Sequence, residues 1–88
     1  MPEVDLGDRK MTHGDFRDHA RITQSLKNVM RGQQGLKRLT DMQVEALEMI
    51  FHKVGRILAG DPNVHDHWDD IAGYAKITSE RIPKDCKQ

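Results

Sequence analysis

One segment of the sequence, residues 40–62, decides most strongly what this chain can fold into. Thr40-Asp41-Met42-Gln43 has the residue types of a helix capping box, in which the Thr and Gln side chains each accept a hydrogen bond from the other residue's backbone N–H. The segment ends at Ala59-Gly60-Asp61-Pro62, where glycine can adopt the left-handed conformation that closes a helix. The spacing therefore predicts a helix over residues 41–59, whose apolar face is the best core-forming surface in the chain: Val44, Leu47, Ile50, Phe51, Val54, Ile57 and Leu58.

The segments on either side have the same helical period. A first helix is predicted over about residues 15–31, and Thr12-His13-Gly14-Asp15 resembles a variant capping box in which Asp15 reaches back. A third helix is predicted over about residues 64–81, ahead of Pro83. Their expected buried stripes are Phe16, Ala20, Ile22, Leu26, Val29 and Met30 in the first, and Val64, Trp68, Ile71, Ala75, Thr78 and Ile82 in the third.

These segments predict an all-α fold of three main antiparallel helices, because both connections are short. Residues 12–82 form a single helical domain in this interpretation, residues 1–11 form a flexible arm, and residues 83–88 form a polar tail. A chain of 88 residues buries too little apolar surface for a thick core, and this one has one Trp, one Tyr and two Phe. We therefore expect self-association into a homo-oligomer that completes the core.

The composition excludes several classes of protein. Lys plus Arg and Asp plus Glu number 14 each, so the net charge is zero and dedicated nucleic-acid binding is not expected. No apolar run approaches the roughly 20 residues that cross a bilayer, so we expect no membrane association and a cytoplasmic protein. Cys86 is the single cysteine, which excludes an intrachain disulfide and a thiolate metal site.

The run His65-Asp66-His67-Trp68-Asp69-Asp70 is the most chemically loaded part of the sequence. Asp66 and Asp70 lie four residues apart and project from the same side of the predicted helix, where like charges repel unless a cation lies between them. Paired carboxylates of this kind favour a hard divalent ion such as Mg²⁺. The alternative interpretation is that acids in a first turn simply complement the helix dipole.

Histidines and Trp68 also have structural and functional interpretations. His65 and His67 can ligate a transition metal, or donate hydrogen bonds to the neighbouring aspartates, which we favour. His19 falls on the apolar side of the first helix and is expected in the core or an interface. Trp68 is expected to pack in the core.

Charged residues of the second predicted helix offer a further candidate site. Glu45-x-x-Glu48 either contributes metal ligands or forms a solvated charged face together with His52. Lys53 and Arg56 either bind a phosphate or bridge to the acids of the third helix. The sequence is compatible with both interpretations of each pair.

Three blocks of this sequence form a recognisable set: Thr12–Phe16, Lys53-Val54-Gly55-Arg56-Ile57, and Asp66-His67-Trp68-Asp69-Asp70-Ile71-Ala72-Gly73-Tyr74-Ala75. They resemble an uncharacterised domain family of phages and prophages, and we expect the protein in the host cytoplasm if a phage encodes it. The family pattern reads approximately Tyr-Gly-Asp, Lys-Ile-Ala-Arg and Asp-x-x-x-Asp-Ile-Ala-Gly-Tyr, and His13 here replaces its Tyr. The likeness spans about residues 12–80, and Asp15, His67 and Tyr74 within it are assigned structural polar roles.

That family in turn is similar to the all-α nucleotide pyrophosphohydrolases of the MazG and dimeric dUTPase type. The resemblance implies a homo-oligomer that binds Mg²⁺ through Glu-x-x-Glu on one helix and an acidic pair on the next. The matching residues are Glu45 and Glu48, followed by Asp66 with Asp69 or Asp70. The second pair begins with Asp rather than Glu, which shortens its reach by one methylene.

Two functions follow as hypotheses. The first is a small phage-type accessory protein that binds a host or phage protein, or a nucleotide, without catalysis. The alternative is a Mg²⁺-dependent nucleoside triphosphate pyrophosphohydrolase or a degenerate relative, in which Asp66, Asp70 and Glu48 hold the ion while Lys53 and Arg56 bind the phosphates. An HD-type phosphohydrolase, suggested by His65-Asp66, ranks lower because those proteins draw further ligands from a longer helical domain.

Overall fold

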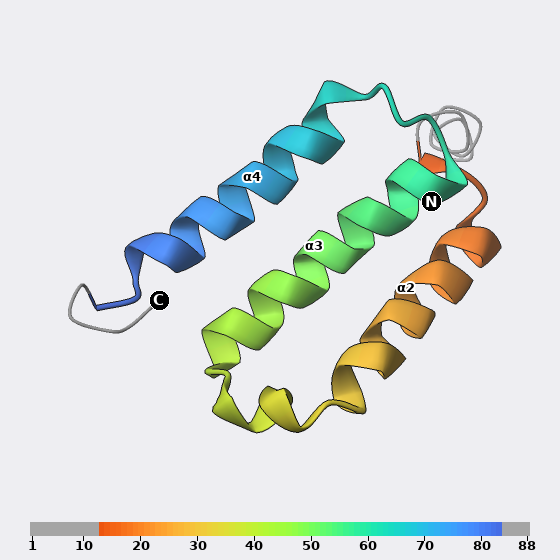
Figure 1. Cartoon of the computed structure of the whole chain (residues 1–88). Coiled ribbons are helices and arrows are strands. Elements are labelled where there is room, and N and C mark those ends of the chain that lie inside the picture. Colours follow the sequence, from red (N-terminus) through yellow and green to blue (C-terminus); the bar gives the residue numbers. More distant parts are fainter. Residues whose placement is uncertain (1–12, 84–88) are drawn as a thin grey trace, which may run out of the picture.

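The computed structural model describes residues 13–83 and contains three α-helices side by side (Figure 1). They are α2, Phe16–Arg31; α3, Asp41–Ala59; and α4, His65–Glu80. The predicted all-α fold is confirmed, and each helix begins and ends within one residue of its expected limits. A short 3-10 helix, η1 (Gln34–Arg38), lies in the first connection and was not predicted. No strand occurs within residues 13–83.

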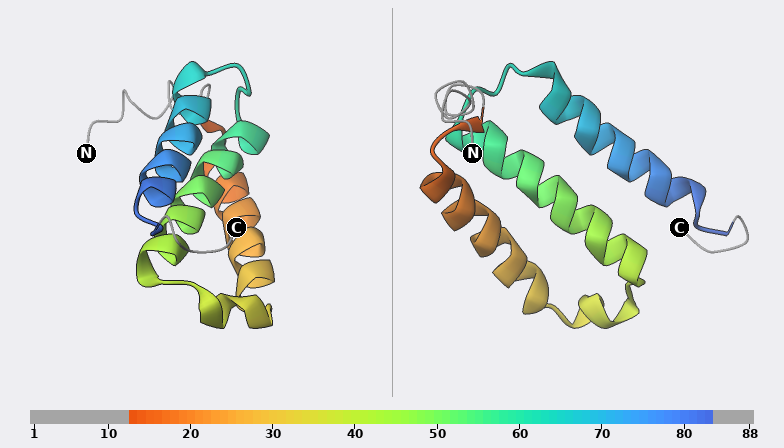
Figure 2. Two further views of the ribbon diagram at one scale, coloured as in Figure 1. Left: turned by 60° about the vertical axis from the view of Figure 1, so that its left-hand side comes forward. Right: turned by 180° about the vertical axis from the view of Figure 1, so that it is seen from behind.

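The central helix is α3, and the other two helices pack along its opposite sides (Figures 1 and 2). Successive helices run antiparallel, as expected for short connections. The three helices therefore form one layer. In a single layer, α3 has neighbours on two sides and leaves its two remaining sides as broad open faces, whereas most domains close a core between two layers.

The N-terminal end of α3 follows the sequence, whereas its C-terminal end differs. The capping box is confirmed: Gln43 N donates to Thr40 Oγ1 at 3.2 Å, and Thr40 N donates to Gln43 Oε1 at 2.9 Å. At α2 the N-cap is Asp15, which accepts from Arg17 N at 2.8 Å; Thr12, where the predicted variant capping box starts, lies outside the described residues. The left-handed cap expected at Gly60 is wrong, because the chain leaves α3 there with φ −124°.

The glycine that needs its conformational freedom is Gly14, with φ +81°. A Cβ at this position would lie 2.1 Å from the carbonyl oxygen of Ala59, so the chain ahead of α2 crosses closely over the end of α3. Because the chain crosses α3 here, His13 reaches α4. Its ring packs edge-on against that of His67, with the ring centroids 5.0 Å apart. Gly14 thus lets one segment touch both α3 and α4.

The buried positions of the described residues are mostly polar. Ala46 is the one buried hydrophobic residue among them. The predicted core stripe of α3 is not buried: Leu58 is 64% exposed, and the other six residues are half-buried. The positions that α3 shares with its neighbours are filled instead by His19, Thr23, Lys53, Gly55 and His67.

Two predicted stripes need correction for the same reason. Trp68 was expected in the core but is 55% exposed, while His67 is 2% exposed and takes the buried position one residue earlier. In α4 the side toward α3 therefore runs through Val64, His67, Ile71, Tyr74 and Thr78. In α2, Phe16 was expected inward but is 79% exposed, and His19 and Thr23 are buried instead.

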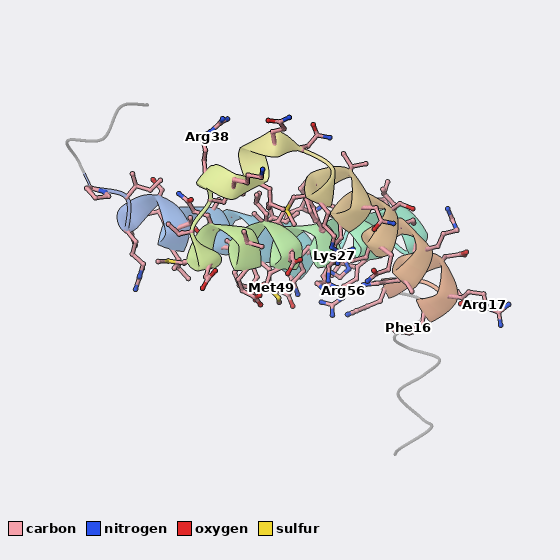
Figure 3. All side chains as sticks on the ribbon, turned by 90° about the horizontal axis from the view of Figure 1, so that it is seen from below. Phe16, Arg17, Lys27, Arg38, Met49 and Arg56 are labelled. Atoms are coloured by element: carbon pink, nitrogen blue, oxygen red, sulfur yellow. The ribbon has the colours of Figure 1, made fainter. Side chains whose placement is uncertain are left out.

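The layer presents two different faces. At 100° per residue, Leu47 and Leu58 point about 180° away from Met49 and Arg56 on α3. Figure 3 shows Met49, Arg56 and Lys27 on one side of the layer and Arg38 of η1 on the other. We call the first side the histidine face, comprising Lys27, Met49, His52 and Arg56. The second side is the apolar face, comprising Ile22, Leu26, Val29, Leu47, Phe51, Val54, Leu58, Trp68, Ala75 and Ile82.

The predicted arm at residues 1–11 lies outside the described residues, as does the tail apart from Pro83. Within residues 13–83 no helix has the length and apolar character needed to cross a membrane.

Candidate functional site

The contact between α3 and α4 centres on an ion pair. Lys53 Nζ lies 2.8 Å from Asp70 Oδ2, and the Lys53 side chain is nearly buried while that of Asp70 is half exposed. The hydrogen bond from Lys53 lowers the pKa of Asp70, and the charges of Lys53, Arg56 and His67 act in the same direction. Asp70 therefore neutralises a lysine that the packing has withdrawn from water.

The contact between α2 and α3 includes a glycine and holds no ion pair. A Cβ on Gly55 would lie 2.5 Å from Thr23 Oγ1, so the glycine allows the helices to approach at this point. Thr23 is 1% exposed, and its Oγ1 has no hydrogen-bond partner among the described residues. Beside this contact, His19 Nε2 and His52 Nδ1 are 3.5 Å apart, a distance at which one imidazole donates to the other.

The surroundings of both histidines of this pair lower their pKa and so favour the neutral form. Burial lowers the pKa of His19, and the charges of Arg56, His52 and Lys53 lower it further. Burial also lowers the pKa of His52, as do Lys27 and Arg56, whereas the more weakly acting Glu48 and Glu45 raise it. The cationic side chains therefore dominate the potential at this end of the contact.

The predicted acidic residues are spread along the layer. Because Lys53 lies opposite Asp70 and the helices are antiparallel, Glu45 and Asp66 are offset by about 18 Å along the axes at 1.5 Å per residue. Such an offset is too large for two carboxylates of one chain to share an ion whose ligands lie at about 2.1 Å. No group of three or more His, Cys, Asp or Glu side chains within residues 13–83 is placed to hold a metal. The magnesium set of Glu45, Glu48, Asp66 and Asp70 stays a prediction.

The two predicted phosphate-binding residues, Lys53 and Arg56, have different surroundings in the structure. Lys53 makes its ion pair with Asp70, which is the bridge to the third helix that the sequence left open as the alternative. Arg56 lies on the histidine face near Lys27 (Figure 3). Neither Arg56 nor Lys27 forms an ion pair with a described carboxylate.

The residues assigned structural polar roles lie at helix ends and contacts. Asp15 caps α2, and His67 packs against His13. Tyr74 is half-buried, and its carbonyl oxygen accepts a hydrogen bond from Thr78 Oγ1 at 2.8 Å. Trp68 has a role that was not predicted. Its indole Nε1 donates a hydrogen bond to Pro62 O at 2.7 Å, which links the loop ahead of α4 to that helix.

Gly14 and Gly55 were the important residues that sequence reasoning missed. Gly55 sits in the middle of α3, where a glycine costs about 1 kcal/mol relative to alanine, and this cost was the available signal for a close helix contact. Gly14 was considered as part of a capping box, although its place between His13 and the capping Asp15 fits a left-handed turn.

A comparison with family models matches residues 3–82 to the family described as "Domain of unknown function (DUF6378)". No curated protein and no solved structure matches the chain.

Proposed function

The chain belongs to the DUF6378 family, whose domain has no known function, and we propose that it is a non-catalytic binding protein that assembles with a second copy of itself through its apolar face. The proposal rests on one observation: the usual distribution of apolar residues inside and polar residues outside is reversed. The polar residues are buried between the helices, whereas the apolar stripe of the central helix is only half-buried and its Leu58 is exposed.

The apolar face has the composition of half a core. On α3, the side opposite Met49 and Arg56 carries no charged residue between Val44 and Leu58. Val29 of α2 and Leu58 of α3 are each 64% exposed there, and Trp68 continues the surface onto α4. A contiguous apolar surface of this kind marks an interaction site, because leaving it in water is unfavourable.

The size of the face suits a stable dimer. The 19 residues of α3 make a helix about 28 Å long, and three helices about 9 Å apart span a similar width. The face therefore offers on the order of 700 Å², close to the roughly 800 Å² that each partner buries in a standard interface.

A second copy is the partner that best fits this surface. Two identical layers packed face to face around a two-fold axis form a two-layer helical core, the arrangement that a single layer lacks. The centre of the interface needs no charge complementarity, because the apolar stripe of α3 carries no charged residue and meets its own copy. Arg38 lies on the same side of the layer, in the connection between α2 and α3. Each histidine face then points outward, available for a further ligand.

The phage-type accessory role rests on the sequence pattern, and the Mg²⁺-dependent pyrophosphohydrolase remains the competing class. The two classes differ in an assay with a panel of nucleoside triphosphates and Mg²⁺. Pyrophosphate release that Asp70→Ala abolishes would favour the enzyme and contradict the non-catalytic proposal. We expect no release above that of the Asp70→Ala variant.

Sedimentation equilibrium over a range of concentrations tests the proposed assembly. We expect the wild-type mass to approach twice 10.1 kDa and to fall on dilution. Leu58→Asp should yield monomer because it places a charge in the interface, whereas Ile77→Asp, at an exposed position on the other side of the layer, should leave the dimer intact. Far-UV circular dichroism of both variants checks that the helices remain.

A wild-type chain that stays monomeric at every concentration would overturn the proposal, and so would equal dissociation by the two variants. A monomer whose apolar face is covered by residues 1–12, or by a different protein, gives the first of these outcomes.

A further inference from the structure

The geometry of the histidine face points to a second site, and we propose that Lys27, His52 and Arg56, with His19 behind them, bind a phosphate dianion. The site uses residues of α2 and α3 on the side of the layer away from the apolar face (Figure 3). It does not depend on the proposed dimer, since each copy contributes a complete set.

The four side chains converge from two helices. His19 and His52 lie across the helix contact with ring centroids 5.7 Å apart. Arg56 is one turn along α3 from His52, and its side chain lies on the same side as that of Lys27. Lys27, His52 and Arg56 are all half-buried, so their charges are less well screened than those of surface residues.

Lys27 and Arg56 have no close counter-ion within residues 13–83, although Glu45 and Glu48 of α3 act on the same place from a greater distance. The ion pairs within that range are Arg21–Asp18, Lys53–Asp70 and Lys76–Glu80, and none of them involves Lys27 or Arg56. Glu45 and Glu48 are the acids that act on His52, and their effect on it is weaker than that of the two cations. Two cations without a close ion-pair partner repel one another, and an anion that contacts both of them offsets that repulsion.

A phosphate matches these donors better than other small ions. Arginine presents a planar pair of N–H groups that meets two phosphate oxygens, and lysine adds a compact charge. The pair of neutral imidazoles keeps one N–H group for the ligand, because the other is used between the two rings. A dianion interacts more strongly with two fixed cations than a carboxylate does. A metal ion is disfavoured because it would share the site with Lys27 and Arg56.

The ligand is therefore either free inorganic phosphate or the phosphate group of a small molecule. The proposed site differs in its residues from the phosphate site predicted from the sequence. Arg56 remains in it, but Lys53 is replaced by Lys27 and the histidine pair, because Lys53 is held by Asp70.

Titration with sodium phosphate at constant ionic strength, followed by NMR of the imidazole nitrogens, tests the site on the full chain. We expect saturable shifts at His19 and His52 and a rise in the pKa of both, because the anion offsets the cations that lower it. Sodium chloride alone should produce neither change. Parallel titrations with glycerol phosphate and a nucleoside monophosphate distinguish free phosphate from a phosphate ester.

Two variants and a control make the result decisive. Lys27→Gln and Arg56→Gln should each weaken phosphate binding about tenfold, as expected for the loss of one charged hydrogen bond. Arg17→Gln, which removes an exposed arginine from the first turn of α2, should bind as the wild type does. Shifts that do not saturate, or that persist unchanged in Lys27→Gln, overturn the assignment. If Arg56→Gln fails to fold, Lys27→Gln decides alone.

Discussion

The contacts between the helices and the apolar face are built from opposite kinds of residue. The two contacts along α3 bury a histidine, a threonine, a lysine and a second histidine, whereas the apolar face leaves leucine, valine and tryptophan partly in water. In most single domains these roles are reversed. In the layer, the polar contacts align the helices, and the difference supports our proposal that the apolar surface packs against a second layer.

The polar contacts are specific because they depend on geometry. Gly55 fits one position on α2, and Lys53 finds its partner only when Asp70 lies opposite. The apolar face makes no such demand, since its stabilisation scales with area. Changes at the contacts should therefore affect folding, and changes on the face should affect association.

The largest effect on folding is expected from Gly14→Ala. The substitution adds a side chain at φ +81° and places its Cβ against the backbone of Ala59. The two costs together amount to about 3 kcal/mol in the free energy of unfolding. Urea denaturation measures it; an unchanged midpoint would show that the crossing over α3 is not as close as described.

Gly55→Ala should cost about 2 kcal/mol, because its methyl group meets Thr23 Oγ1 where the helices approach. The double variant with Thr23→Ala removes the hydroxyl that causes the overlap and should recover most of the loss. Thermal unfolding of the two single variants and the double variant gives the coupling energy. Additive effects would contradict a direct contact between these positions.

Acidification should weaken the contact between α2 and α3 before it weakens the one between α3 and α4. The pKa values of His19 and His52 lie below 6.5 in the folded chain, so the unfolded chain binds more protons as the pH falls below 6.5. Stability should therefore be greatest above that pH and decline as the solution is acidified. Urea denaturation at pH about 7.5 and about 5 measures the loss.

His52→Gln supplies the control, because it should reduce this pH dependence. The Lys53–Asp70 pair responds in a lower window: the pKa of Asp70 lies below 3.8, so the pair's contribution is present above 3.8 and is lost as the pH falls through the lower folded value. Stability that rises as the pH falls from 6.5 would contradict the assignment of neutral, buried histidines.

The smallest effect is expected at Ile77, an exposed apolar residue outside the apolar face. Ile77→Asn should change the free energy of unfolding by no more than about 0.5 kcal/mol, since the side chain is already in contact with water. A larger loss would indicate that the histidine side of α4 is also covered, and would remove the contrast between the two faces.

The sequence predicted the helices well because their limits depend on local interactions. Thr40 and Gln43 cap α3 as their spacing indicated, and the three segments have the expected lengths. Local signals cannot determine which side of a helix meets a neighbour. The apolar residues of α3 were taken as the core by default, and nothing in their spacing distinguishes a surface buried within one chain from one left open.

The candidate site was only partly predictable for the same reason. Lys53 was recognised as a bridge to the third helix or a phosphate ligand, and the packing of α3 against α4 decided for the bridge. The pairing of His19 with His52 joins residues 33 positions apart, so it depends on the alignment of α2 with α3. That alignment comes from Gly55 and Thr23, whose contact no periodicity reveals.

Isotope-filtered NMR on an equal mixture of labelled and unlabelled chains tests the central claim most directly, because it detects contacts between copies. We predict intermolecular nuclear Overhauser effects from the side chains of Leu47, Phe51 and Leu58 to one another, and none involving Met49 of the histidine face. Contacts between copies that involve Met49 instead, or no contacts at any concentration, would contradict the assignment of the apolar face to a second copy.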